Sequence, residues 1–171
     1  MTSPMIKRAT VRDAERLTDL MHASRAYAGA YAAMLAGYRI TADYIAAHPV
    51  HLAESPDGKL LGFYALLLEQ AELDLLFVAD AAQGTGLGRL LVEHMLERAR
   101  EHGLERVRVV SHPPAEPFYR RVGARRTGTV PASPPKVTWD RPELSFTTAT
   151  TATVAATAES SRGAADADGR G

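Results

Sequence analysis

The sequence predicts an α+β domain in which helices flank a central sheet that is mixed and mostly antiparallel. One observation is the turn at residues 55–58, Ser-Pro-Asp-Gly, which separates two apolar runs and indicates a β-hairpin. Another is the stretch 73–103, where an apolar run, a glycine-rich turn and a strongly periodic segment indicate a buried strand and then a long helix. A third is the pattern after residue 103, which indicates a further strand, a short helix and two final strands.

The first third of the chain predicts one strand followed by helices. The strand is expected at 5–9, and Thr10 and Asp13 have the spacing of a capping box at the start of a helix. Residues 26–47, rich in Ala, Tyr and Met, predict one or two helices broken near Gly37, with Thr41 as the candidate N-cap of the second. The residues expected on the buried face of the first helix are Val11, Leu17, Leu20 and Met21.

The rest of the chain predicts six strands and two helices. His112 and the two prolines after it end one strand before a short helix at 115–122, which Gly123 stops. Gly103 is placed to end the long helix. The strands are expected at 50–54, 59–68, 71–78, 106–111, 125–130 and 144–147. The apolar face of the long helix is formed by Leu87, Leu90, Leu91, Met95, Leu96 and Ala99.

Composition limits the classes of protein. A chain of 171 residues with 46% hydrophobic residues is long enough for one domain with a full core. Its 20 basic and 20 acidic residues cancel, so we expect no nucleic-acid partner and no attraction to an anionic membrane. It contains no cysteine, which excludes disulfides, thiolate metal sites and an acyl-cysteine intermediate. The scattered histidines predict no metal site.

The two ends of the chain indicate the extent of the domain. The N-terminus has no apolar segment typical of a secretion signal, and no stretch approaches membrane-spanning length, so a cytoplasmic protein is expected. From Thr148 onward the composition changes to Thr, Ala, Ser, Gly and Asp with a single Val, too little apolar surface to order a chain. We therefore predict one domain at 1–147 and a disordered tail at 148–171. The sequence leaves a homodimer open.

The glycine-rich turn has the features of a phosphate-binding loop. Gly84, Gly86 and Gly88 lie where the helix begins, and the first amide groups of a helix have no partners within it. Glycines let an anion approach these donors, and the helix dipole adds to the attraction. Arg89 stands where a dinucleotide fingerprint needs glycine, and Arg89 followed by Leu90 excludes a P-loop. A glycine-rich turn that binds no ligand is the simpler alternative.

Four segments together resemble the GNAT superfamily of N-acetyltransferases. Gln83, Gly86 and Gly88 match its pyrophosphate-loop pattern (Q/R)-x-x-G-x-(G/A). The strand AELDLLFV, the loop QGTGLG, the strand RVRVVS and the segment AEPFYRRVGA occur in the family's order and spacing. The last is similar to A-x-x-FY-x-x-x-GF, with Ala124 in place of the usual aromatic residue. The resemblance covers about residues 5–147 and implies the GNAT fold, acetyl-CoA as co-substrate and an amine as acceptor.

The resemblance also implies a set of acetyl-CoA contacts. Phe77 and Val78 would present backbone groups to the pantetheine arm in the manner of an added strand. Ser111 stands where many members have an Asn that contacts the cofactor, and its hydroxyl can still form a hydrogen bond. The pyrophosphate would lie on the loop residues Gln83, Gly84, Thr85, Gly86, Leu87, Gly88 and Arg89.

Catalytic roles are indicated by chemistry and by the same resemblance. Tyr119 matches the family tyrosine near the thioester sulfur, and a phenol with a pKa of ~10 stays protonated and can donate to the departing thiolate. The alternative for Tyr119 is a core position, as we expect for Phe118. Glu72 and Asp74 project from one face of a strand, and Glu72 stands where some members carry a glutamate base, although a solvated face explains the pair equally well. His112 is a third candidate, and many members use ordered water.

We therefore expect an acetyl-CoA-dependent N-acetyltransferase. The acetyl group would pass directly to a primary amine, because no cysteine is present to carry it. The acceptor is a small molecule or a peptide amine; the neutral net charge and the tyrosines of the second segment favour a small amine. Most of these tyrosines are expected in a helix–sheet interface, and one or two in a substrate pocket: Tyr27, Tyr31, Tyr38 and Tyr44. A non-catalytic acyl-CoA-binding module and a scaffold that binds nothing are the alternatives.

Overall fold

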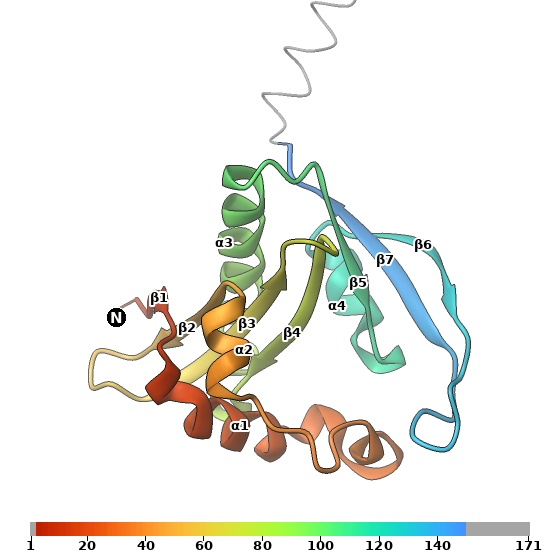
Figure 1. Cartoon of the computed structure of the whole chain (residues 1–171), viewed down its shortest axis with the longest axis horizontal. Coiled ribbons are helices and arrows are strands. Elements are labelled where there is room, and N and C mark those ends of the chain that lie inside the picture. Colours follow the sequence, from red (N-terminus) through yellow and green to blue (C-terminus); the bar gives the residue numbers. More distant parts are fainter. Residues whose placement is uncertain (1–2, 150–171) are drawn as a thin grey trace, which may run out of the picture.

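The computed structural model describes residues 3–149, which form one seven-stranded sheet with helices on both faces (Figure 1). The order across the sheet is β1-β2-β3-β4-β5-β7-β6, and every neighbouring pair is antiparallel except β4 with β5. The predicted α+β fold with a mixed, mostly antiparallel sheet is confirmed. The strands are β1 (Met5–Arg8), β2 (Val50–Glu54), β3 (Leu60–Leu67), β4 (Glu72–Val78), β5 (Arg106–Val110), β6 (Arg125–Val130) and β7 (Arg141–Thr147).

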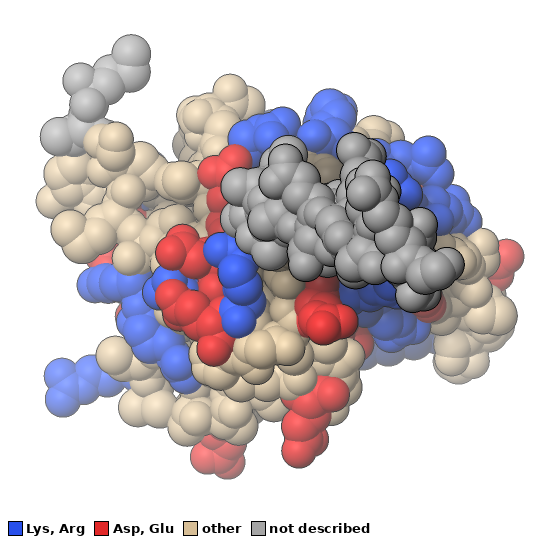
Figure 2. Space-filling model, turned by 90° about the horizontal axis from the view of Figure 1, so that it is seen from above, with Lys and Arg blue, Asp and Glu red and all other residues tan. Residues whose placement is uncertain are grey.

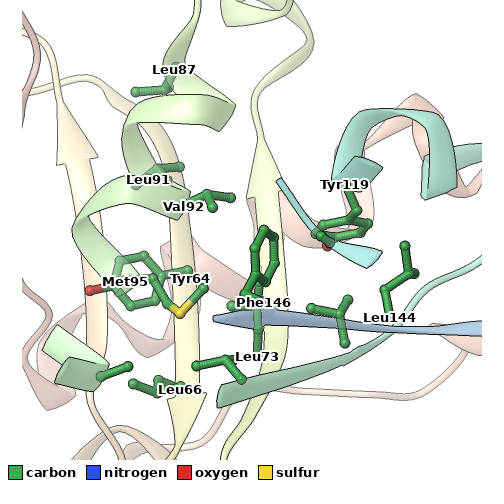
Figure 3. Close-up of a cluster of buried hydrophobic side chains, with 14 of the residues drawn as sticks. Tyr64, Leu66, Leu73, Leu87, Leu91, Val92, Met95, Tyr119, Leu144 and Phe146 are labelled. Atoms are coloured by element: carbon green, nitrogen blue, oxygen red, sulfur yellow. The ribbon is translucent and has the colours of Figure 1, made fainter. Parts of the chain in front are cut away.

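Two apolar cores lie on the two faces of this sheet. Helices α3 (Leu87–Glu101) and α4 (Glu116–Arg121) cover one face, where Leu91, Met95 and Tyr119 are buried together (Figure 3). Helices α1 (Ala14–Ala23) and α2 (Ala42–Ala47) cover the other, with Leu17, Met21 and Ile45 in its core. The remaining helical segments are short 3₁₀ turns: η1 (Val11–Asp13), η2 (Arg25–Tyr27), η3 (Gly29–Met34), η4 (Asp80–Ala82) and η5 (Pro113–Ala115).

The segment before β2 departs from the prediction in detail. Val11 lies in the 3₁₀ turn η1 and is 51% exposed, so its assignment to the buried face of the first helix was wrong. The predicted break at Gly37 is confirmed by its φ of +73°, and α2 follows it. Before Gly37 the chain forms the 3₁₀ turns η2 and η3 instead of the predicted helix. The N-cap at Thr41 is confirmed: its hydroxyl accepts the Tyr44 amide at 3.1 Å.

Helix α3 lies close to the sheet because a glycine faces it. A Cβ atom at Gly62 of β3 would lie 2.8 Å from the Phe77 carbonyl oxygen and 3.2 Å from Leu91 Cδ1. The stop at Gly103 is confirmed by a φ of +78° there. The predicted apolar face was wrong at Leu90, which is 38% exposed. The residues of α3 that are buried are Leu87, Leu91, Val92, Met95 and Ala99.

Strands β4 and β5 touch at one end and diverge at the other (Figure 1). Their single paired position is Glu72 with Arg108, and the Arg108 amide donates to the Ala71 carbonyl at 2.7 Å. Leu73 and Leu75 of β4 pair with consecutive residues of β3, which makes Asp74 the extra residue of a β-bulge. The bulge bends β4 away from β5, and the backbone of β4 beyond Glu72 is left unpaired on that side.

The C-terminal end of the domain also differs from the prediction. β7 begins at Arg141 rather than at 144 and so includes Pro142. Proline lacks an amide donor, but the Pro142 carbonyl still accepts the Ser111 amide at 3.0 Å and pairs β7 with the end of β5. Thr148 was assigned to the tail, but it is only 5% exposed and its hydroxyl donates to the Leu104 carbonyl at 2.6 Å. The domain therefore includes Thr148, and the predicted tail from 150 to 171 lies outside the described residues.

Three further features concern the surface charge, the length of the helices and the grouping of possible metal ligands. On the uncovered part of the face shown in Figure 2, both Lys and Arg side chains and Asp and Glu side chains are present. None of the helices between residues 3 and 149 has both the length and the apolar character needed to cross a membrane. Within the same range no three His, Asp or Glu side chains gather as metal ligands would.

Candidate active site

The glycine-rich turn lines a cleft of about 470 Å³, here named the loop cleft. It is lined by the end of β4, the turn, the first residues of α3 and the helix α4. The residues predicted for acetyl-CoA that line it are Val78, Gln83, Gly84, Gly86, Leu87, Gly88 and Arg89. It is also lined by Ser24, Ala26, Phe118, Arg121 and Val122, which the sequence did not single out for this role.

The turn presents backbone donors to the loop cleft. Gly84 and Gly86 have φ values of +75° and +86°, a left-handed conformation that favours glycine, and a Cβ atom at either would meet nothing within 4 Å. The first hydrogen bond of α3 runs from the Leu90 amide to the Gly86 carbonyl at 3.1 Å, so the amides before Leu90 have no helical partner. Open space next to unpaired amides at the positive end of a 15-residue helix suits a phosphate.

Two neighbouring contacts hold the turn in place. The Gln83 side-chain amide donates to the Val78 carbonyl at 3.1 Å, which ties the turn to the end of β4. Gly88 packs against Phe118 of α4, since a Cβ atom there would lie 3.0 Å from two atoms of the Phe118 ring. Phe118 thus contacts the core, as expected for it, and also forms part of the wall of the loop cleft.

A second cleft of about 310 Å³ runs along β4 and β5 and is here named the acceptor cleft. Tyr27 and Tyr38 line it together with Glu72, Asp74 and Tyr119, so two of the four tyrosines are in a pocket. The two clefts meet where β4 and β5 diverge. They share Leu76, His112 and Ala115.

Tyr119 reaches the acceptor cleft from within a packed core. Figure 3 shows its ring beside Phe146 of β7, and the two ring centroids are 6.3 Å apart. The side chain is 8% exposed, and its hydroxyl makes no hydrogen bond with any residue from 3 to 149. Burial, with a smaller contribution from Tyr27, raises the pKa of Tyr119 above its ordinary value.

The two candidate carboxylates have different surroundings. Glu72 is half-buried and faces Arg108 at 3.5 Å, and burial raises its pKa although Arg108 acts in the opposite direction. Asp74, on the bulge, is exposed and accepts a hydrogen bond of 2.5 Å from the Tyr44 hydroxyl. Burial and this bond raise the pKa of Tyr44, so that phenol stays protonated. Both carboxylates line the acceptor cleft, whereas their spacing predicted only that they share one face of the strand.

His112 lies at the junction of the two clefts and is held by aromatic rings. Its ring stacks on Tyr27 with centroids 4.2 Å apart, and Tyr31 meets its edge at 5.5 Å. The pKa of His112 is lowered by burial, so the ring is neutral near pH 7, and a neutral ring donates from Nε2 to the Ala26 carbonyl at 3.1 Å. Trp139 extends the aromatic group by packing on Tyr31 at 4.8 Å.

The comparisons with known proteins decide the family. A model of the acetyltransferase (GNAT) domain matches residues 36–132, which is more than half of the chain. The chain belongs to the GNAT acetyltransferase family. Acetyl transfer to amines is the general activity of this family, and an acyltransferase is the class of enzyme that the match supports. No curated protein matches the sequence significantly.

Solved GNAT structures agree with the fold over most of the chain. A GCN5-related N-acetyltransferase from Rhodopseudomonas palustris superimposes with a TM-score of 0.71 at 18% identity, over 86% of this chain and 97% of its own. The ribosomal-protein-S18-alanine N-acetyltransferase from Escherichia coli gives 0.66 at 14%, over 87% and 96%. YncA from Salmonella typhimurium, solved with acetyl-CoA, gives 0.64 at 19%, over 87% and 96%. At identities of 14–19% these superpositions show a shared fold and nothing more specific.

Three residues assigned to acetyl-CoA lie apart from the loop cleft in this GNAT domain. The Phe77 side chain is buried in the core under α1 and α2, and the residue lines the acceptor cleft instead. The Thr85 hydroxyl donates to the Ala82 carbonyl at 2.5 Å. Ser111 is buried, lines the acceptor cleft, and donates to the His112 carbonyl at 2.7 Å, so its hydroxyl already has a protein partner.

Two arginines that line the clefts were not predicted from the sequence, Arg121 in the loop cleft and Arg141 in the acceptor cleft. Arg121 belongs to the segment AEPFYRRVGA, whose resemblance to the family was a usable signal, and its carbonyl accepts Arg89 Nη2 at 3.3 Å. Arg141 had no such signal, because β7 was predicted to begin three residues later.

Proposed function

We propose that this protein transfers the acetyl group of acetyl-CoA directly to a primary amine in a ternary complex. The observation that carries the proposal is the junction of two clefts at Leu76, His112 and Ala115. One cleft offers donors for phosphates and the other offers carboxylates and a phenol. A donor and an acceptor molecule entering from the two sides would have their reacting groups meet at this junction.

The residues of the loop cleft suit acetyl-CoA, which would supply an acetyl thioester with a thiol leaving group. The amides of the turn and the guanidinium groups of Arg89 and Arg121 would bind the phosphates. The unpaired edge of β4, including Val78, would bind the amide-rich pantetheine arm by adding it as a strand.

Tyr119 would act as the proton donor to the sulfur. Its raised pKa keeps the phenol protonated at neutral pH, and its hydroxyl is free of other hydrogen bonds among the described residues. Complete transfer to a free thiolate of pKa ~8.5 would be uphill. The Tyr119 proton would therefore pass to the sulfur while the carbon–sulfur bond breaks. The attacking nitrogen must lose a proton once it carries the acetyl group, and that proton would return to Tyr119.

Glu72 would remove the first proton from the incoming ammonium group, directly or through a water molecule. Its raised pKa brings it closer to neutral pH, where a general base works best. Asp74 is engaged by Tyr44 at 2.5 Å, which gives it the separate task of holding α2 over the acceptor cleft. His112 keeps its Nε2 proton on the Ala26 carbonyl and serves as the wall between the clefts.

The test is a titration with acetyl-CoA and then with an amine panel in which free thiol is measured. We expect saturable binding and thiol release that depends on an amine. Binding without thiol release for any amine would support a non-catalytic acyl-CoA-binding module, and absence of binding would leave a scaffold.

A matched pair of variants tests the turn itself. Gly86→Glu places a negative side chain in the phosphate position and should abolish acetyl-CoA binding. Gly103→Glu is the control, because Gly103 has a similar φ of +78°, compared with +86° for Gly86, and equally open surroundings at the other end of α3. Unchanged acetyl-CoA affinity in folded Gly86→Glu would reject the phosphate-binding role.

A further inference from the structure

Arg141 is a charged residue in the wall of the acceptor cleft that lacks a counter-ion. It begins β7, and its Nε atom is buried without a hydrogen-bond partner among residues 3–149. None of the ion pairs formed within that range includes Arg141. Arg108, on the neighbouring strand, is by contrast paired with Glu72 at 3.5 Å and with Glu143 at 2.9 Å.

A buried guanidinium N–H without a partner is costly. The group stays charged at all ordinary pH values, and it carries five donors in a planar fork. Arg141 is half-buried, and its Nε–H, which folding leaves unpaired, loses the hydrogen bond it had with water. The geometry of the fork matches the two oxygens of a carboxylate, which it binds with two parallel hydrogen bonds. A carboxylate in the acceptor cleft would therefore supply the partner that the chain does not.

The charge of Arg141 reaches the residues that face the amine. It lowers the pKa of Glu72 slightly, against the larger effect of burial, and it does the same for Tyr27. Glu72 nevertheless makes its ion pair with Arg108 rather than with Arg141. The acceptor cleft thus has an acidic group available for an amine and, within electrostatic reach of it, an unpaired cationic group available for an acid.

We propose that the acceptor is an amino acid, or a similar small amine with a carboxylate a few bonds away. Arg141 binds the carboxylate and so turns the amine towards Glu72 and the junction of the clefts. This inference rests on the proposed acetyl transfer and adds the class of acceptor. The volume of about 310 Å³ accommodates a molecule of that size.

The kinetic test uses matched acceptors that differ only by the carboxylate, such as leucine with isopentylamine and phenylalanine with phenethylamine. We expect the wild type to have a higher kcat/KM for the amino acid of each pair. Arg141→Gln should lower kcat/KM for the amino acids roughly 10- to 100-fold and leave the simple amines nearly unchanged. Arg141→Lys keeps the positive charge but not the planar pair of donors, so its kcat/KM for the amino acids should lie between those of the wild type and of Arg141→Gln. The control is Arg106→Gln, an exposed arginine of β5 outside both clefts.

A binding measurement keeps the inference testable without turnover. In an NMR titration, the Nε–H resonance of Arg141 can be assigned by its loss in Arg141→Gln. It should shift when each of the twenty common amino acids is added in the presence of CoA, and it should not shift when the corresponding decarboxylated amines are added. Acetylation of simple amines at least as efficient as that of their amino acids would overturn the inference and leave acetyl transfer intact. An unshifted resonance with every amino acid would also overturn it, whereas a failure to bind acetyl-CoA would overturn the proposed function instead.

Discussion

Tyr119→Phe separates a role in proton donation from a role in packing. The change removes only the hydroxyl, and the ring contacts with Phe118 at 5.3 Å and Phe146 at 6.3 Å remain. Because the hydroxyl makes no hydrogen bond among residues 3–149, the free energy of unfolding should change by less than about 1 kcal/mol. The loss of a general acid lowers a rate by roughly 10²- to 10⁴-fold, and we expect kcat to fall by roughly 10²-fold.

Tyr64→Phe is the matched control, with the opposite expected result. The Tyr64 ring is fully buried in the core under α3, and its hydroxyl lies 2.8 Å from His94 Nδ1, outside both clefts. Losing that bond should lower the free energy of unfolding by about 1–2 kcal/mol, because the partly buried His94 ring nitrogen is left without its partner. The value of kcat should stay within a factor of about two of wild type.

Three measurements on each variant decide the outcome. Urea unfolding gives the free energy of unfolding, calorimetry gives the acetyl-CoA affinity, and thiol release at saturating amine gives kcat. For Tyr119→Phe we expect a loss of rate without a loss of affinity or stability. An equal loss of rate and affinity would assign the hydroxyl to cofactor binding, and an unchanged rate would make Tyr119 an ordinary core residue and refute the proposed mechanism.

Four further predictions concern other parts of the domain. Glu72→Gln should lower kcat roughly 10²-fold, because a general base is lost. It should also remove the acidic limb of the pH profile of kcat/KM, since a base acts only when it is ionised. In the wild type this limb should lie above the ordinary glutamate pKa of 4.5. Gly62→Ala should lower the free energy of unfolding by about 1–3 kcal/mol in urea titrations, because the new methyl group would clash with backbone at 2.8 Å. Burial chiefly lowers the pKa of His51 from 6.5 to about 4, so the unfolded state binds the proton more strongly. Stability should therefore fall as the pH drops from 6.5 towards 4, by about 1–2 kcal/mol after allowing for partial exposure, and His51→Phe should reduce this pH dependence. Truncation after Ala149 should leave the melting temperature nearly unchanged, whereas truncation that also removes Thr148 should lower it, because three hydrogen bonds of Thr148 with Arg100, Leu104 and Glu105 are lost.

The sequence by itself determined the features that depend on neighbours along the chain. The boundaries of α3 are set by glycines at its two ends and by helical periodicity between them, and both ends were predicted. The cap at Thr41 is likewise a contact over three residues. The candidate phosphate-binding loop could be proposed from the sequence because the conformation of a glycine-rich turn depends on the spacing of residues such as Gln83, Gly86 and Gly88.

Only the tertiary structure decided how the two clefts are assembled. The bulge at Asp74 is defined by the register of β4 against β3. The divergence of β4 from β5 starts at a parallel pairing between residues 36 positions apart. Neither feature therefore leaves a pattern among neighbouring residues of the sequence. Thr148 was misassigned for the same reason, because its composition is that of a tail while its partners at 100, 104 and 105 are distant in sequence. Arg141 enters the acceptor cleft only because β7 extends through Pro142, which local preferences disfavour in a strand. A single sequence encodes which groups can carry out the chemistry; long-range pairing decides which of them share a cavity.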